Sequence, residues 1–152
     1  MAFALLYPVF AQEQPEQKAY RSRQIGDKAF NDGYYSLAVK FYSQYKTEAA
    51  DDPIALKDAY LCLFSAYVRD KDSKNARKDF QEFSAKFAED LLINTESRQR
   101  ADYWNANIML LDGEFDKAIA LFNKILKTAP DISDIYCESL SGLGMAYINL
   151  PD

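Results

Sequence analysis

The stretch GEFDKAIALFNKILKTAPD, residues 113–131, decides the fold of this 152-residue chain. A glycine, two aromatic residues, a small residue and a proline stand in it at fixed intervals: Gly113, Phe115, Ala118, Phe122 and Pro130. The apolar positions recur with helical spacing. A glycine before such a segment and a proline after it are typical of helix boundaries. The stretch therefore predicts an amphipathic helix between a turn at Gly113 and a stop near Pro130.

The same pattern occurs earlier in the chain. Residues 33–42 and 113–122 both read G-x-[YF]-x-x-A-x-x-x-[FY], and a weaker copy begins at Lys71. The central alanines are separated by 38 and then 42 positions: Ala38, Ala76 and Ala118. The part of the repeat that precedes this pattern recurs as well. Ile25-Gly26 stands before Ala29, Leu63-Phe64 before Tyr67, and Leu143-Gly144 before Tyr147. A period of one helix pair predicts stacked helical hairpins.

This pattern closely resembles the tetratricopeptide repeat, whose consensus runs W-x2-L-G-x2-Y, then G-x-[YF]-x2-A-x3-F, then P. The resemblance implies an all-α fold, a right-handed α-solenoid of stacked antiparallel helix pairs with about three and a half repeats over residues 16–152. The repeats align at 19–52, 57–94 and 99–132, with a half repeat from about 137. The expected helices span 16–32, 34–50, 54–70, 73–89, 96–112, 115–129 and 133–149, with a loop at 90–95 and Thr95 as an N-cap.

Each position of the pattern has a physical role. Gly33 and Gly113 are expected in the left-handed conformation that ends the first helix of a pair. Ala38 and Ala118 are expected where the two helices cross, so a large residue there should cost roughly 1–3 kcal/mol. One turn later, aromatic side chains are expected to fill the groove against the next pair: Tyr42, Phe80 and Phe122. Prolines are expected to stop the second helices: Pro53 and Pro130.

The composition excludes several classes of function. A formal net charge of -5 argues against a nucleic-acid binder, which should be basic. The absence of histidine removes the commonest general base and the commonest transition-metal ligand. Two cysteines are too few for a disulfide framework or a four-thiolate zinc site. We therefore expect no catalytic residue, no metal and no cofactor, and a protein that is not an enzyme.

Local patterns that suggest chemistry are better explained as parts of helices. Residues 112–116, DGEFD, lack the glycine and closing glutamate positions of a calcium loop, and residues 142–146, GLGMA, lack the third glycine of a dinucleotide fingerprint. The adjacent acids Glu89 and Asp90 are interpreted as a solvated helix end.

The two cysteines are expected to be free thiols about 20 Å apart. Cys62 should pack as a small apolar residue, while a bridge between molecules through Cys137 stays open.

The N-terminal run FALLYPVFAQEQPEQ is apolar up to Ala11 and then turns polar. Val9 and Ala11 fit the -3 and -1 positions of a signal-peptidase cut, although no basic residue precedes the run. It is too short to span a bilayer. Residues 1–15 are therefore expected to be a clipped or mis-started export signal, with a helix packed on the domain as the alternative. The corresponding location is periplasmic or exported, with a cytoplasmic location as the alternative.

The C-terminal stretch SLSGLGMAYINLPD, residues 139–152, reads as the first helix of a repeat. It is too apolar for a terminal helix, which normally carries a polar outer face. We expect the chain to be a fragment of a longer protein. The alternative is that this helix pairs with a second copy and forms a homodimer.

The tetratricopeptide resemblance implies a binding surface in the concave groove, which the first helix of each repeat lines. Tyrosine and arginine are typical interface anchors, and asparagine can pair with a peptide backbone. A clamp for C-terminal carboxylates is not expected, since Asp27, Cys62 and Trp104 occupy positions that would need asparagine or a basic residue. An ordinary solvated helix face stays the alternative. The candidate groove residues are Tyr20, Arg23, Asp27, Asn31, Asp58, Leu61, Ser65, Arg69, Arg100, Tyr103, Asn107 and Leu111.

The expected function is a non-catalytic protein–protein interaction scaffold that holds a peptide segment or a partner domain in this groove. The period near 38 residues and the export-like run are also similar to periplasmic repeat proteins of the bacterial cell envelope. No nucleic-acid partner and no stable membrane insertion are expected. Two alternatives remain: a self-associating homodimer module, and an accessory N-terminal domain of a larger enzyme.

Overall fold

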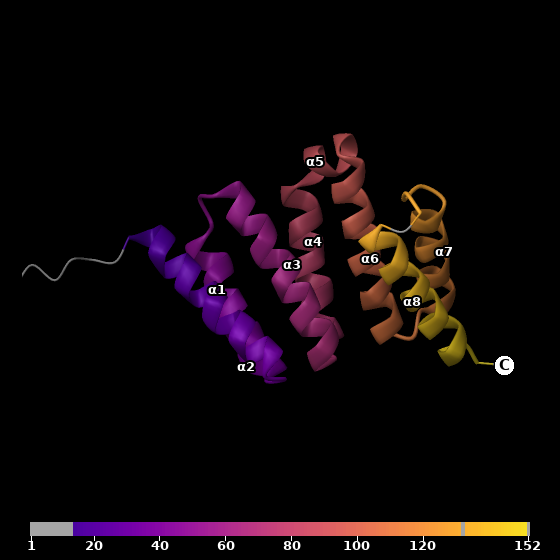
Figure 1. The fold of residues 1–152 in the computed structure, drawn as a ribbon, viewed down its shortest axis with the longest axis horizontal. Helices are drawn as coiled ribbons and strands as arrows, with labels where there is room; N and C mark the ends of the chain where they lie inside the picture. Colours follow the sequence, from indigo (N-terminus) through magenta and orange to yellow (C-terminus); the bar gives the residue numbers. More distant parts are fainter. Residues whose placement is uncertain (1–13, 132, 152) are drawn as a thin grey trace, which may run out of the picture.

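The computed structural model describes residues 14–131 and 133–151, and within these ranges it contains eight α-helices and no strand. The helices form a row along the long axis of the molecule, with α1 and α2 at one end and α6, α7 and α8 at the other (Figure 1). Neighbours in sequence pack against each other, as α1 does on α2, α2 on α3, α6 on α7 and α7 on α8. The bounds are α1 Pro15–Asn31, α2 Tyr35–Glu48, α3 Pro53–Asp70, α4 Ser73–Lys86, α5 Ala88–Ile93, α6 Thr95–Leu111, α7 Phe115–Leu126 and α8 Asp134–Asn149.

The turns within the first and third helix pairs have the predicted backbone. Gly33 has φ 82° and Gly113 has φ 75°, which confirms the left-handed conformation at both. After α1, the Gly33 N–H donates to the Phe30 carbonyl (3.0 Å) and the Tyr34 N–H to the Ala29 carbonyl (2.8 Å). This pair of bonds satisfies carbonyl groups that the helix end would otherwise leave unpaired.

The second pair uses the same turn without a glycine. Lys71 has φ 59°, and the following Asp72 N–H donates to the Tyr67 carbonyl at 3.0 Å. Left-handed backbone costs an ordinary L-residue roughly 1–2 kcal/mol. The weak copy of the sequence pattern therefore has the same turn as the strong copies, at a cost in local strain.

The alanines at the helix crossings are fully buried, as predicted: Ala38, Ala76 and Ala118. One turn later Tyr42 and Phe122 are buried and Phe80 is half-buried, also at the predicted place. A methyl group at the crossing lets two helix backbones approach, and the ring beside it fills the adjacent groove. These positions account for the close packing of each second helix on its first helix.

Two glycines allow the aromatic rings to lie directly on a neighbouring helix. A Cβ built on Gly26 of α1 would lie 2.5 Å from Tyr42 Cε1, and one built on Gly142 of α8 would lie 2.4 Å from Phe122 Cζ. Both distances are far inside van der Waals contact. The two rings therefore occupy space that a side chain at either glycine would need.

The centre of the molecule is an aromatic cluster between α3 and α4. Tyr60, Phe64 and Phe83 are almost completely buried, with the Phe83 ring centroid 5.6 Å from each of the other two. Edge-to-face pairs at this separation add to the hydrophobic gain from burial. Half-buried rings of α4, α6 and the residue before α5 extend the cluster: Phe80, Trp104 and Phe87. The cluster joins the second helix pair to α6.

The segment between α4 and α6 differs from the prediction. Residues 90–95 were expected as a loop, but α5 covers Ala88–Ile93, and α4 ends earlier, at Lys86. The expected N-cap Thr95 is wrong by one position, because Asn94 accepts the hydrogen bond from the Ser97 N–H at 3.1 Å. The segment lacks glycine and proline, so nothing in its sequence prevents a short helix.

The two prolines also act differently from the prediction. The helix α2 ends at Glu48, and Pro53 is the first residue of α3, where its fixed φ and missing N–H fit the first turn. Asp52 caps this turn by accepting from the Ile54 N–H at 2.9 Å. Pro130 lies in the loop after α7, which ends at Leu126.

The proposed export signal, residues 1–15, lies outside the described residues apart from residues 14 and 15. No helix of the described chain is long and apolar enough to span a membrane.

Candidate partner-binding cleft

A cleft of about 510 Å³ lies between the C-terminal part of α3, α6 and α8. It contains three of the predicted groove residues, Tyr103, Asn107 and Leu111. The cleft therefore unites part of the predicted binding face of α6 with a face of α8. Its other lining residues are Val68, Lys71, Leu110, Phe115, Glu138, Ser141, Gly142, Met145 and Asn149.

The lining of the cleft is mainly apolar, with a few polar groups among the apolar side chains. Met145 is 53% exposed, which is high for a methionine. Asn107 Nδ2 donates to the Tyr103 carbonyl at 2.9 Å, and Asn149 Nδ2 donates to the Met145 carbonyl at 2.7 Å. These bonds fix the two amide groups on opposite walls. An apolar surface with a few oriented polar groups is typical of sites that bind another molecule.

Tyr103 is held at the edge of the cleft by other aromatic rings. Its ring centroid lies 5.0 Å from that of Trp104 and 6.2 Å from that of Phe122. Burial, and then the negative charge of Glu138, raise the pKa of the Tyr103 hydroxyl. The hydroxyl is therefore a neutral hydrogen-bonding group at neutral pH, and the ring has a fixed position.

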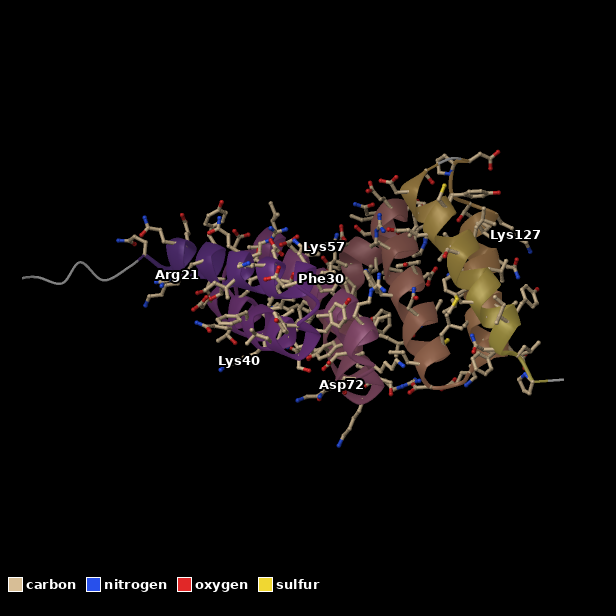
Figure 2. All side chains as sticks on the ribbon, turned by 60° about the horizontal axis from the view of Figure 1, so that its bottom comes forward. Arg21, Phe30, Lys40, Lys57, Asp72 and Lys127 are labelled. Atoms are coloured by element: carbon tan, nitrogen blue, oxygen red, sulfur yellow. The ribbon has the colours of Figure 1, made fainter. Side chains whose placement is uncertain are left out.

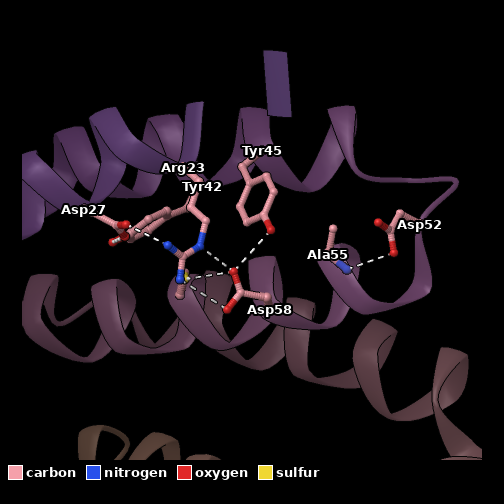
Figure 3. Close-up of polar contacts among 8 residues, drawn as sticks. Arg23, Asp27, Tyr42, Tyr45, Asp52, Ala55 and Asp58 are labelled. Carbon is pink, nitrogen blue, oxygen red and sulfur yellow. Dashed lines mark hydrogen bonds and ion pairs between the residues drawn. The ribbon is translucent and has the colours of Figure 1, made fainter. Parts of the chain in front are cut away.

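Arg23 and Asp27, both predicted for the groove, form a network that joins α1, α2 and α3 (Figure 3). Arg23 Nε donates to Asp58 Oδ2 at 2.6 Å, and Arg23 Nη1 donates to Asp27 Oδ2 at 2.9 Å. The Tyr42 hydroxyl donates to Asp27 at 2.9 Å and the Tyr45 hydroxyl to Asp58 at 3.2 Å. Both carboxylates thus have a cation and a phenol as partners. The structure uses these side chains to hold three helices together.

The same network raises the pKa of its cation and phenols. The hydrogen bond that Arg23 donates to Asp58 raises the pKa of Arg23 above its ordinary value. Burial is the largest cause of the raised pKa of both Tyr42 and Tyr45. The arginine therefore stays charged and the phenols stay neutral over the whole range in which a protein is stable. The network therefore joins α1, α2 and α3 through charged and phenolic groups.

Arg100 is also engaged within the molecule. Its Nη1 lies 2.5 Å from Glu138 Oε2, which links α6 to α8. Because both side chains are partly exposed, the pair contributes little to stability. The pair connects two walls of the cleft, which Glu138 also lines.

The other predicted groove residues do not converge on the cleft. Tyr20 is 62% exposed and lines a separate depression beside Glu48 and Asp52. Leu61 and Asp58 border a depression between α3 and α5, and Ser65 donates to the Cys62 carbonyl at 2.7 Å. The remaining two are exposed on α1 and α3: Asn31 and Arg69.

The α8 side of the cleft was missing from the predicted site. Glu138, Ser141, Met145 and Asn149 recur with helical spacing and line the cleft together. This spacing is visible in the sequence. Extending the groove positions into the half repeat would therefore have found this wall.

Lys57, which is labelled in Figure 2, connects α3 to α5 and α6. Its Nζ lies 2.5 Å from Asp90 Oδ2 and 2.6 Å from Ser97 Oγ, so α3 is tied to α5 and α6. The hydrogen bond from Lys57 is the largest cause that lowers the pKa of Asp90. Asp90 is therefore paired with a cation.

No group of His, Cys, Asp and Glu residues in the described ranges has the geometry to hold a metal ion.

Both cysteines are free thiols in this structure. Cys62 is half-buried and packs against the cluster between the first two helix pairs, as a small apolar residue does. Burial, and then the charge of Asp58, raise its pKa to about 12. Cys137 is exposed on α8.

Comparison with known proteins does not assign a role to this site. The sequence matches no model of a known protein family, and no curated protein matches it. The arrangement of the helices and the chemistry of the cleft therefore carry the functional argument.

Proposed function

We propose that the chain is a tetratricopeptide-like repeat module that binds a protein segment without catalysing a reaction. In this proposal the helix pairs form a solenoid, and the binding surface is the cleft between α3, α6 and α8. The repeated burial of Ala38, Ala76 and Ala118 supports the repeat assignment. The left-handed residue before each of them supports it as well.

The observation that carries the binding proposal is the cleft itself. Residues of α3, α6, α7 and α8 line it, its surface is mainly apolar, and Met145 is exposed within it. An apolar side chain of a bound segment would gain about 25 cal/mol for each Å² of apolar surface removed from water. The amides of Asn107 and Asn149 lie close enough to hydrogen-bond the backbone of such a segment.

The walls of the cleft are held in place before a partner arrives. The Arg100–Glu138 pair connects α6 to α8, and Phe122 packs on Gly142 of α8. A receptor that is already ordered loses little conformational entropy on binding. The proposed mechanism is therefore recognition by a preformed surface.

Selection of linear peptides from a random display library tests this function. We expect enriched peptides that bind the folded chain. In calorimetry, Asn107→Ala and Met145→Asp should each weaken a selected peptide about ten-fold or more, as loss of a central contact does. Leu37→Asp is the matched control, because Leu37 is an exposed apolar residue on α2, away from the cleft.

A selected peptide that binds Met145→Asp as well as the parent chain would contradict the assignment to this cleft. Equal loss of affinity in Leu37→Asp and Met145→Asp would contradict it too, because the effect would then follow added charge at any position. Circular dichroism of each variant shows that the helices are retained.

A further inference from the structure

Lys71 combines a strained backbone with a place in the lining of the cleft. Its φ of 59° is the left-handed conformation that Gly33 adopts in the first helix pair and Gly113 in the third. A glycine takes this conformation without the steric cost that a lysine has. The turn after α3 therefore contains a side chain that its backbone disfavours. Such an outlier at a cleft points to a use for the side chain.

The Lys71 ammonium forms no ion pair or hydrogen bond with any side chain that the structure describes. The acids next to it in sequence have partners on other helices. Asp70 accepts from Ser36 Oγ of α2 at 2.7 Å, and Asp72 accepts from the Asn75 N–H of α4 at 3.1 Å. The ammonium is therefore available to a group that enters the cleft.

Arg69 supplies a second cation at the same end of α3. Its side chain is exposed, and it too lacks an ion pair within the described ranges. Burial is the largest cause that raises the pKa of the Tyr103 hydroxyl, and the charge of Arg69 opposes that rise. The guanidinium therefore lies near Tyr103, at the edge of the cleft. Arg69 also stands 42 positions before Leu111, which lines the cleft, and the crossing residues Ala76 and Ala118 have the same separation.

The other charges of the cleft are already paired. Glu138, the acidic residue of the described lining, lies 2.5 Å from Arg100. The remaining α8 side chains of the lining are neutral: Ser141, Met145 and Asn149. The cleft thus has two unpaired cations at its α3 end and a mainly apolar, neutral surface beyond them. On a chain with a formal net charge of -5, this is a local site for an anion.

We propose that the segment bound in the cleft carries an acidic side chain close to its apolar residues, and that Lys71 and Arg69 bind this carboxylate. The inference rests on the proposed function and adds the charge of the bound segment to it. The amides of Asn107 and Asn149, on opposite walls, suit the backbone of a segment that continues through the cleft. The carboxylate therefore belongs to an Asp or Glu side chain within the segment and not to the end of a chain.

Two physical effects favour an acidic segment over a neutral or basic one. Hydrogen bonds from an ammonium or guanidinium to a carboxylate are charge-assisted and stronger than those between neutral groups. The apolar lining beside the cations excludes water from the contact once a segment is bound, which strengthens the attraction. A basic segment would instead bring like charges together at the α3 end. All of these cationic and donor groups belong to α3, to the turn after it and to α6, which are interior parts of the described chain.

Peptide display tests the charge of the segment. The random peptides are flanked on both sides by constant neutral linkers, so that no chain end is offered. Selected peptides that lose affinity with Asn107→Ala are scored as cleft binders, because this variant changes no charge. We expect Asp and Glu to be enriched at least about three-fold in the cleft binders over the unselected library. The net charge of -5 favours basic peptides elsewhere on the surface, so this enrichment has to come from a local site.

Calorimetry of one acidic cleft binder, with both termini capped, shows whether the two cations bind its carboxylate. Exchange of the acidic residue for its amide should weaken binding to the parent chain about three-fold or more. The double variant Arg69→Gln, Lys71→Asn should weaken the acidic peptide by a similar factor, and should bind the acidic and amide peptides about equally. Asparagine is chosen at position 71 because it tolerates the left-handed backbone.

The double variant Lys40→Gln, Arg98→Gln is the matched control. It removes one lysine and one arginine from exposed positions of α2 and α6 outside the lining, and should change the affinity less than two-fold. Cleft binders without enriched acids, or an equal preference of the Arg69→Gln, Lys71→Asn variant and the parent for the acidic peptide, would overturn the inference and leave binding in the cleft intact. An equal loss in the control variant would overturn it as well. If no selected peptide depends on Asn107, the proposed function fails, and this inference fails with it.

Discussion

Single glycine residues have opposite roles within α8. Gly142 lies against the Phe122 ring, whereas Gly144, two positions later, faces open space. The Phe122 ring is fully buried and has little room to move. The same substitution at the two positions should therefore change stability in opposite directions.

We predict that Gly142→Ala lowers the free energy of unfolding by about 1–3 kcal/mol, because the added methyl group overpacks the contact with Phe122. Gly144→Ala should raise it by about 0.5–1 kcal/mol, because alanine is the better helix former. Urea unfolding followed by circular dichroism measures both. A loss of stability in Gly144→Ala as large as that in Gly142→Ala would contradict the packing assigned to the two residues.

Residues at helix crossings and turns were predictable from the sequence, and long-range partners were not. The positions of Gly33, Ala38 and Ala118 follow from local geometry, because a left-handed turn favours a glycine and a close crossing needs a small side chain. Arg23 was predicted on the correct helix, but its partner Asp58 lies 35 residues away. No local pattern distinguishes an arginine that is free to bind a ligand from one that is already paired.

At the level of secondary-structure elements, Arg77 connects the second helix pair to the third. Its Nε donates to Asp112 Oδ2 at 3.0 Å, and its Nη2 lies 2.9 Å from Glu114 Oε1, at the turn between α6 and α7. The hydrogen bond from Arg77 is the largest cause that lowers the pKa of Asp112 below its ordinary value of 3.8. A carboxylate with a depressed pKa stabilises the fold above its unfolded pKa. That stabilisation disappears as the pH falls through the folded value.

We predict that Arg77→Gln is less stable than the parent chain at pH 6 and that the difference shrinks as the pH falls below about 4. At low pH the carboxylate is protonated in both proteins, so the arginine no longer has a charged partner. Thermal unfolding at a series of pH values measures the difference. Arg98→Gln is the control, because it removes the same charge from an exposed position of α6. A difference between parent and Arg77→Gln that stays constant down to about pH 2.5 would refute this role of Asp112.

The elements themselves were largely predictable, with one informative failure. Amphipathic periodicity and turn residues located every long helix to within a few residues. The helix α5 was missed because a segment of six residues is too short to show a period. Contacts such as Lys57 with Asp90 hold it in place instead. Asn94 and Thr95 are both good capping residues, so the sequence alone could not choose between them.

At the scale of the whole molecule, the core is concentrated near the middle of the row of helices. The helix α3 has seven buried residues and packs against α2, α4 and α6, whereas α8 has three and an open face. Local stability in such a row follows the contacts that each helix makes with its neighbours. The two ends of the row should therefore open more readily than the centre.

We predict that backbone amides in α3 exchange with deuterium at least about ten-fold more slowly than those in α8, because exchange from α3 needs a larger part of the molecule to open. Hydrogen-exchange mass spectrometry of peptides from the two helices measures this. The comparison uses amides from helix interiors, so that frayed ends do not contribute. Equal protection of the two helices would indicate one fully cooperative unit instead.

The candidate cleft was less predictable than the fold because it depends on this larger arrangement. Tyr103 and Asn107 lie in the cleft as part of the predicted face of α6, but α3 contributes through Val68, and the turn after it through Lys71. Neither residue is among the candidate groove residues that were named from the sequence. Which residues of neighbouring helices share a depression depends on side-chain volumes and helix angles, and a repeat pattern fixes neither of these.

The turn residues Gly33 and Lys71 are 38 positions apart and both have left-handed backbone. A gene could therefore gain or lose 38 codons between these two points while each remaining helix still entered its turn in the same way. The chain would change in length by one helix pair without a new kind of junction. Recombination at equivalent turns is thus a simple route by which relatives of this protein could evolve arrays of different size.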